Sequence, residues 1–93
     1  MGIKSFEYVV QGTVQGVNFR SWTVKQAKAI GVTGYVSNHS SGDVTGYAEG
    51  DSEPLAKFAK VLERGPSAAD VNEVEIKNEQ EIEKAKYSSF ESD

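Results

Sequence analysis

The stretch Thr13–Trp22, TVQGVNFRSW, joins a segment with the pattern of a strand to one with the pattern of a helix. In residues 4–14 before it, apolar and polar side chains largely alternate, which is the period of a half-buried strand. In residues 20–31 after it, apolar side chains recur at helical spacing and a glycine follows the last of them. The stretch therefore predicts a strand–turn–helix unit, with Gly16 in the turn and Arg20 in the first turn of the helix.

The middle of the chain predicts a hairpin and a second helix. Residues 34–38 (GYVSN) and 44–50 (VTGYAEG) have strand patterns, and the turn formers HSSGD separate them. Residues 51–65, DSEPLAKFAKVLERG, carry an apolar face at helical spacing, and Asp51 or Ser52 can cap that helix.

The last quarter of the chain is open to two interpretations. Residues 69–78 place Val74 and Ile76 in an alternating pattern typical of a strand. Residues 72–86, however, are rich in helix formers and bring apolar side chains near one face of a helix. The residues alone leave strand and helix equally open here, and YSSF at 87–90 could form a short final strand.

With a strand in the last quarter, the order of elements is β-α-β-β-α-β, the split βαβ or ferredoxin-like arrangement. This α+β fold class places two helices on one face of a four-stranded antiparallel sheet and leaves the other face partly wet. The 93 residues suffice for one domain, and we expect residues 1–93 to form it.

The composition excludes several kinds of site. The chain has no cysteine and one histidine, His39, which excludes disulfides, thiolate chemistry and multi-histidine metal sites. We therefore expect no metal and no cofactor. The N-terminal MGIKSFEY has no apolar signal-peptide core, and a chain without cysteine suits a reducing compartment, so the cytoplasm is the expected location.

Charge and hydropathy also limit the partners. The net charge is −4, and no basic cluster is longer than two residues, which argues against nucleic acid. No apolar run approaches the roughly 20 residues that a membrane-spanning helix needs. We expect a monomer without nucleic-acid or membrane partners.

The turn before the first helix has two properties of an anion site. Gly16 can adopt a positive φ, which lets successive N–H groups point into one concavity, and the first N–H groups of a helix carry partial positive charge. The Arg20 guanidinium could bind phosphate or carboxylate oxygens there through two parallel bonds. The spacing alone equally allows a solvated surface arginine or an ion pair with a nearby glutamate.

Two longer motifs resemble the acylphosphatase family. Residues 12–23, GTVQGVNFRSWT, match its pattern G-x-V-Q-G-V-x-F-R. Residues 27–50, AKAIGVTGYVSNHSSGDVTGYAEG, match its later G-x-V-x-N, a turn, G-x-V and a final acidic or amide residue before glycine. RGPSAADV at 64–71 also resembles the segment that follows the family's second helix, so the resemblance extends over residues 6–90.

The resemblance implies a ferredoxin-like fold in which residues 74–78 are a strand. It implies hydrolysis of the carboxyl–phosphate anhydride of a small-molecule acyl phosphate to a carboxylate and inorganic phosphate, with phosphate as product and inhibitor. It also implies that Arg20 holds the phosphoryl group and that Asn38 orients the attacking water. The phosphate-binding loop then uses the main-chain N–H groups of Gln15, Gly16, Val17, Asn18, Phe19 and Arg20.

Three features depart from the family pattern. Thr13 stands where the family often has a basic residue, and Asn18 where an aromatic is common. The end of the chain, FESD, is short and acidic where family members often continue an apolar or basic strand. The first two bear on substrate preference, and the third bears on the packing of the last strand.

The remaining candidate residues have simpler readings. We expect His39 in an exposed turn, and Phe19 and Trp22 in the packing of the helix on the sheet. Asp43 and Glu49 are expected to be surface charges.

Two other functions stay open from the residues alone. An RNA-binding module on this fold would stack bases on aromatic residues of the central strands, such as Tyr8 and Tyr47, although GDVTGYAEG does not match the RNA-binding strand motif. A domain of this kind could also bind acyl phosphate or phosphate as a regulator or as part of a larger enzyme.

Overall fold

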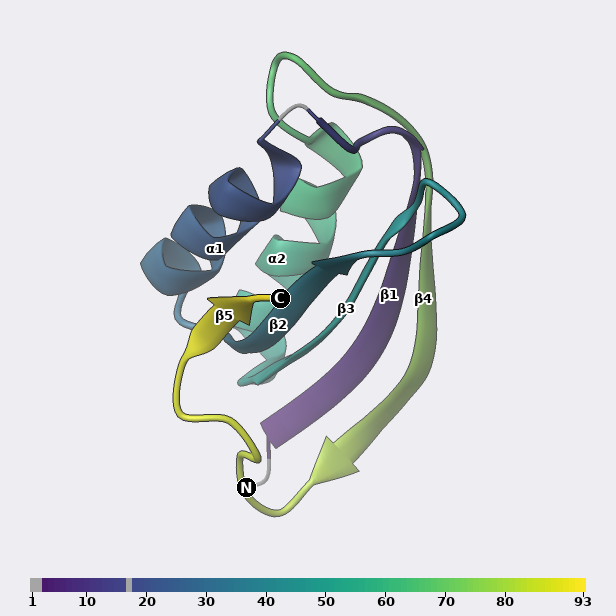
Figure 1. Cartoon of the computed structure of the whole chain (residues 1–93). Helices are drawn as coiled ribbons and strands as arrows, with labels where there is room; N and C mark the ends of the chain where they lie inside the picture. The colour runs from purple at the N-terminus through teal and green to yellow at the C-terminus, as the bar shows by residue number, and fades with distance from the viewer. Residues whose placement is uncertain (1–2, 17) are drawn as a thin grey trace.

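The computed structural model describes residues 3–16 and 18–93 (Figure 1). Its elements along the chain are β1 (Ile3–Thr13), α1 (Phe19–Ile30), β2 (Thr33–Asn38), β3 (Val44–Gly50), α2 (Ser52–Arg64), β4 (Asp70–Ile82) and β5 (Phe90–Ser92). The order β-α-β-β-α-β is therefore present, and one further strand follows it.

The sheet has five strands in the order β4-β1-β3-β2-β5. The first four strands are antiparallel to their neighbours, whereas β5 runs parallel to β2. The prediction of four antiparallel strands is wrong in this respect. After β4, residues 83–89 carry the chain across to the opposite edge of the sheet, and Phe90 is then buried in the core beside β2 (Figure 1). The sheet is consequently mixed.

Residues 70–82 form a strand, although their composition also favours a helix. β4 pairs with β1 along nearly its whole length, with a register shift between Ser5 and Glu7. At that shift Asn78 adopts a φ of 53°, which asparagine tolerates better than most residues, and its side chain donates to Glu7 Oε2 at 3.0 Å. Pairing with the free edge of β1 satisfies backbone groups of both strands and outweighs the local helix preference.

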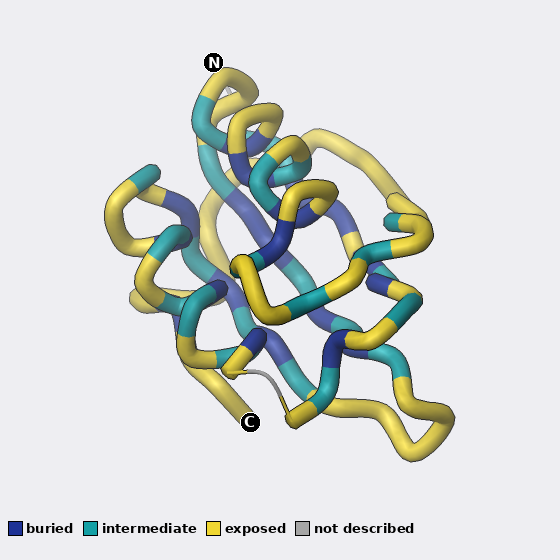
Figure 2. Tube along the Cα trace, turned by 90° about the horizontal axis from the view of Figure 1, so that it is seen from above, coloured by how far each residue is buried: buried dark blue, intermediate teal, exposed yellow. Residues whose placement is uncertain are grey.

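The two helices lie together on one face of the sheet (Figure 1). Figure 2 shows the buried positions concentrated between the helices and the strands. The core is made of side chains from both layers, including Phe6, Tyr8 and Val10 of β1, Val36 of β2, Val44 and Ala48 of β3, Phe19 and Ala27 of α1, and Leu55, Phe58 and Leu62 of α2. Within the described residues, neither helix has the length and hydropathy needed to cross a bilayer.

A hydrogen bond beneath β3 links the two halves of the sheet. Tyr8 Oη of β1 donates to the carbonyl oxygen of Tyr35 in β2 at 2.8 Å, although β3 lies between these strands. The crossing passes Gly46 of β3, where an added Cβ would lie 2.2 Å from Tyr8 Oη and 2.3 Å from the Tyr35 oxygen. Glycine is required at this position because any larger residue would collide with both atoms. Burial raises the pKa of Tyr8 well above its usual value.

Candidate active site

Two of the described residues in the loop between β1 and α1 have a positive φ. Gly16 has a φ of 76°, and Asn18 has a φ of 62° at the N-cap of α1. Asn18 makes no side-chain capping bond, but its carbonyl oxygen accepts the N–H of Trp22 at 3.0 Å. The left-handed turn at Asn18 leads directly into α1, whose first N–H groups lack intrahelical partners. Val17 lies outside the described residues.

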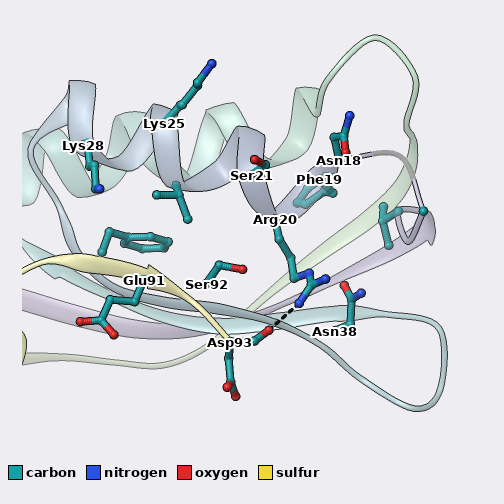
Figure 3. Close-up of a pocket in the computed structure, with 14 residues that line it drawn as sticks. Asn18, Phe19, Arg20, Ser21, Lys25, Lys28, Asn38, Glu91, Ser92 and Asp93 are labelled. Atoms are coloured by element: carbon teal, nitrogen blue, oxygen red, sulfur yellow. Dashed lines mark hydrogen bonds between the residues drawn. The ribbon is translucent and has the colours of Figure 1, made fainter.

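Arg20 points from the first turn of α1 towards the end of β2 (Figure 3). Its Nη1 donates to the main-chain oxygen of Asp93, just after β5, at 2.5 Å. A guanidinium has five N–H donors, so this contact leaves others that can bind an anion. Among the described residues, Arg20 thus binds a main-chain oxygen that holds its side chain over the cleft. Within these residues it does not form the ion pair with a nearby glutamate that the spacing also allowed.

Asn38 is the last residue of β2 and its side chain is exposed. It lies next to the Arg20 guanidinium in Figure 3, on the same side of the sheet. The alternation along β2 explains this direction, since Gly34 and Val36 also face the helices and are buried. The amide of Asn38 is therefore presented beside the guanidinium at the mouth of the loop.

The side chain of Gln15 has a role that the sequence interpretation missed. Its Nε2 donates to the carbonyl oxygens of His39 at 2.7 Å and Asp43 at 2.9 Å. These two residues also close the turn after Asn38, because the N–H of His39 donates to Asp43 at 2.8 Å. Gln15 therefore ties the loop to the turn that carries Asn38. A glutamine directly before the turn glycine was the available signal, but its partners are distant in sequence.

One cleft of about 840 Å³ brings the candidates together. Its lining comes from the loop, α1, the end of β2 and β5, and includes Gly16, Asn18, Phe19, Arg20 and Asn38. Lys25 and Lys28 of α1 also line it, as do Glu91, Ser92 and Asp93. In Figure 3 the carboxylates of Glu91 and Asp93 point away from Arg20, whereas the guanidinium faces the cleft. The Arg20 guanidinium is thus the charged group drawn beside Asn38 in that view.

The structure confirms the predictions for His39 and Phe19 and contradicts the one for Glu49. His39 is an exposed turn residue, as predicted, and its Nδ1 lies 2.9 Å from Ser41 Oγ. Phe19 is buried and its ring lies 5.6 Å from that of Trp22, as expected for packing residues. The prediction that Glu49 is a surface charge is wrong, because Glu49 is fully buried. Its Oε1 accepts the main-chain N–H of Tyr87, and no local pattern places the connection that carries Tyr87 over β3.

No group of three or more His, Cys, Asp or Glu side chains in the described ranges 3–16 and 18–93 is arranged to hold a metal ion. The polar groups beside one another at the end of β2 are instead the Arg20 guanidinium and the Asn38 amide. Such a set suits an anion and does not suit a cation.

Comparison with known proteins agrees with this arrangement. The acylphosphatase family model matches residues 6–92. Acylphosphatase-2 of Bos taurus is 40% identical over 89 residues, which are 95% of this chain and 90% of that protein. The acylphosphatase of Pelotomaculum thermopropionicum is 48% identical over 68 residues, covering 73% of this chain and 74% of the relative. The solved structure of an acylphosphatase from Coxiella burnetii superposes with a TM-score of 0.85 at 35% identity, covering 99% of this chain and 94% of the other.

The chain belongs to the acylphosphatase family. This membership makes it a hydrolase and implies that it acts on small acyl phosphates.

Proposed function

We propose that the cleft at the β1–α1 junction hydrolyses the carboxyl–phosphate anhydride of acyl phosphates. In this mechanism Arg20 and the N–H groups of Gln15–Arg20 hold the phosphoryl group, and Asn38 orients the attacking water. The observation that carries the proposal is the meeting of Arg20 and Asn38 at one end of a single cleft, beside a loop with positive-φ residues (Figure 3).

The chemistry is compatible with a site that lacks thiols and imidazoles. The leaving group is a carboxylate whose conjugate acid has a pKa of about 4, so no general acid must protonate it. Phosphoryl transfer requires mainly in-line positioning and stabilisation of charge on the phosphoryl oxygens. Fixed N–H donors and a guanidinium supply that stabilisation without reorganising during the reaction.

Asn38 acts in this scheme on the water and not on the phosphate. An amide is far too weak a base to take a proton from water, but it can accept one hydrogen bond and hold the oxygen in line. The proton then passes to a phosphate oxygen of the substrate. Every atom is accounted for: the water oxygen bonds to phosphorus, the anhydride P–O bond breaks, and the products are inorganic phosphate and a carboxylate.

We further propose that residues 1–93 act as one domain and as a monomer, and that inorganic phosphate returns to the same loop as a competitive inhibitor. The donors that hold the phosphoryl group of the substrate would also bind the product, since both present the same oxygens.

The direct test is hydrolysis of benzoyl phosphate by the purified chain in the presence of EDTA. We expect full activity after exhaustive chelation. Activity that vanished with EDTA and returned with Mg²⁺ would contradict the proposed mechanism, and the absence of hydrolysis under both conditions would contradict the proposed function.

The RNA-binding alternative loses one of the two aromatic residues on which it depends. Tyr8 is 1% exposed and lies among core residues under the helices, so it is not available to stack on a base. A short single-stranded RNA titrated in parallel should leave the protein fluorescence unchanged.

A further inference from the structure

Glu49 is a buried carboxylate on the face of the sheet that the helices do not cover. It is 0% exposed. Its Oε1 accepts the main-chain N–H of Tyr87 at 2.7 Å and the hydroxyl of Thr33 at 3.4 Å, and its Oε2 accepts the hydroxyl of Tyr47 at 2.9 Å. A buried carboxylate is costly unless donors surround it, and here three donors from three segments converge on one side chain.

The bond from Tyr87 is the one that fixes a long exposed connection. All of residues 83–89 between β4 and β5 are exposed. The Tyr87 ring packs on the rings of Tyr35 and Tyr47, with centroid distances of 5.9 and 5.4 Å. Lys86 Nζ also lies 5.9 Å from the centre of the Tyr47 ring. The bond to Glu49 therefore fixes where the connection crosses the open face, and the tyrosine rings pack beside that point.

β5 starts at Phe90, shortly after Tyr87 in the chain. The carbonyl oxygen of Ser89 accepts the N–H of Gly34 at 3.1 Å, and the N–H of Asp93 donates to the carbonyl oxygen of Val36 at 2.9 Å. The main-chain oxygen of Asp93 then accepts Arg20 Nη1 at 2.5 Å. A continuous series of contacts thus leads from the buried carboxylate, along a three-residue strand, to the guanidinium in the cleft.

We propose that Glu49 is a positioning residue for Arg20, acting through Tyr87 and β5; this rests on the proposed function of Arg20. β5 is too short to fix its own register, since three residues supply few ladder bonds. Phe90 anchors the strand in the core, and Glu49 holds the chain ahead of Phe90 on the opposite face of the sheet. Together they determine where Asp93 and, with it, the Arg20 guanidinium come to lie.

The test removes the hydrogen bond between the Tyr87 N–H and Glu49 by changing either partner, and each change has a matched control. Glu49→Ala deletes the acceptor, whereas Glu49→Gln keeps an oxygen for the Tyr87 N–H. Tyr87→Pro deletes the N–H, whereas Tyr87→Ala deletes only the ring and keeps the N–H. We expect Glu49→Ala and Tyr87→Pro to lower kcat/KM for benzoyl phosphate about tenfold relative to their controls, since small displacements of a catalytic group are costly.

A double-mutant cycle shows whether the loss passes through Arg20. In an Arg20→Gln background, Tyr87→Pro should cause little further loss relative to Tyr87→Ala, because the group being positioned is gone. An undiminished loss in that background would overturn the proposal. Tyr87 is exposed, so this pair still gives an answer if Glu49→Ala does not fold.

Side-chain ¹⁵N relaxation of Arg20 gives a readout that does not need activity. We expect Arg20 Nε to be restrained in the wild type, Glu49→Gln and Tyr87→Ala, and to become mobile in Tyr87→Pro. An Arg20 side chain equally restrained in all variants would overturn the positioning role. If wild-type protein and Arg20→Gln had equal activity, the proposed function would fail instead, while the relaxation result would still decide the structural claim.

Discussion

The two edges of the sheet differ in length and in what they support. β4 has thirteen residues, pairs with β1 along its length, and leaves every one of its residues exposed or half-buried. β5 has three residues, pairs with β2 alone, and contains the buried Phe90. The cleft lies at the β5 edge, while β4 closes the far side of the sheet (Figure 1).

The difference shows that the length over which an edge strand pairs does not determine how much the cleft depends on that strand. The pairing of β4 with β1 is spread over many residues, so we expect single changes there to have small effects. β5 depends on a few contacts from distant segments, and those contacts end at Arg20. We expect substitutions near the cleft to have larger effects on catalysis than substitutions on β4.

The largest effect is expected at Arg20. We expect Arg20→Gln to lower kcat/KM for benzoyl phosphate by roughly 10³, because charge-assisted donors to the transition state are lost. Arg20→Lys should recover little of this, since an ammonium cannot form two parallel bonds to the phosphoryl oxygens. Steady-state kinetics of the two variants measures both effects, and a fully active lysine variant would show that a point charge suffices.

The next effect is expected at Asn38, at the end of β2 beside β5. Asn38→Ala should lower kcat by roughly 10² with KM little changed, because a group that acts in the transition state is removed. Circular dichroism must first show a native fold, since Asn38 precedes a turn. Near-normal turnover would remove Asn38 from the mechanism.

A change at Gly46 tests the link between the two halves of the sheet. We expect Gly46→Ala to destabilise the fold by about 2 kcal/mol, because the added Cβ would overlap Tyr8 Oη and the Tyr35 carbonyl oxygen. Tyr8→Phe removes the hydrogen bond from Tyr8 Oη to the Tyr35 carbonyl oxygen without adding an atom, and it should lower the free energy of unfolding by about 1 kcal/mol. Urea unfolding of both variants gives the two losses in the free energy of unfolding, and their difference is the cost of the steric overlap. If both variants were equally stable, the added Cβ would not overlap its neighbours as the structure indicates.

The smallest effect is expected on β4. Glu81 is exposed and lies opposite Lys4 of β1. Glu81→Ala should change stability by less than about 0.5 kcal/mol and leave kcat unchanged, as is usual for exposed substitutions. If this variant slowed catalysis as much as the variants around β5 do, the contrast between the edges would not hold.

Local sequence patterns were sufficient to predict most of the individual strands and helices. The alternation of β1, the helical spacing after Arg20 and the turn formers between β2 and β3 each predicted an element that the structure contains. The positive φ expected at Gly16 is present as well. The strand at 70–82 required the family resemblance, because its composition also suits a helix and only pairing with β1 decides the outcome.

The rest depended on contacts between residues far apart in the chain. Nothing near Glu49 in the sequence indicates that it is buried, because one of its partners, Tyr87, lies far along the chain. The parallel pairing of β5 and the contact of Asp93 with Arg20 follow from the same return of the chain across the sheet. The partners of the Gln15 side chain were hidden for a similar reason, since they belong to a turn that folds back onto the loop.

The central claim is that Arg20 binds the phosphoryl group and that Asn38 touches only the water. Calorimetric titration of inorganic phosphate into wild type, Arg20→Gln and Asn38→Ala tests it most directly. We expect Arg20→Gln to weaken phosphate binding by more than about tenfold, since the charge-assisted bonds are lost. Asn38→Ala should stay within a few-fold of wild type. Equal losses in two natively folded variants would contradict the claim, because Asn38 would then be part of the anion site itself.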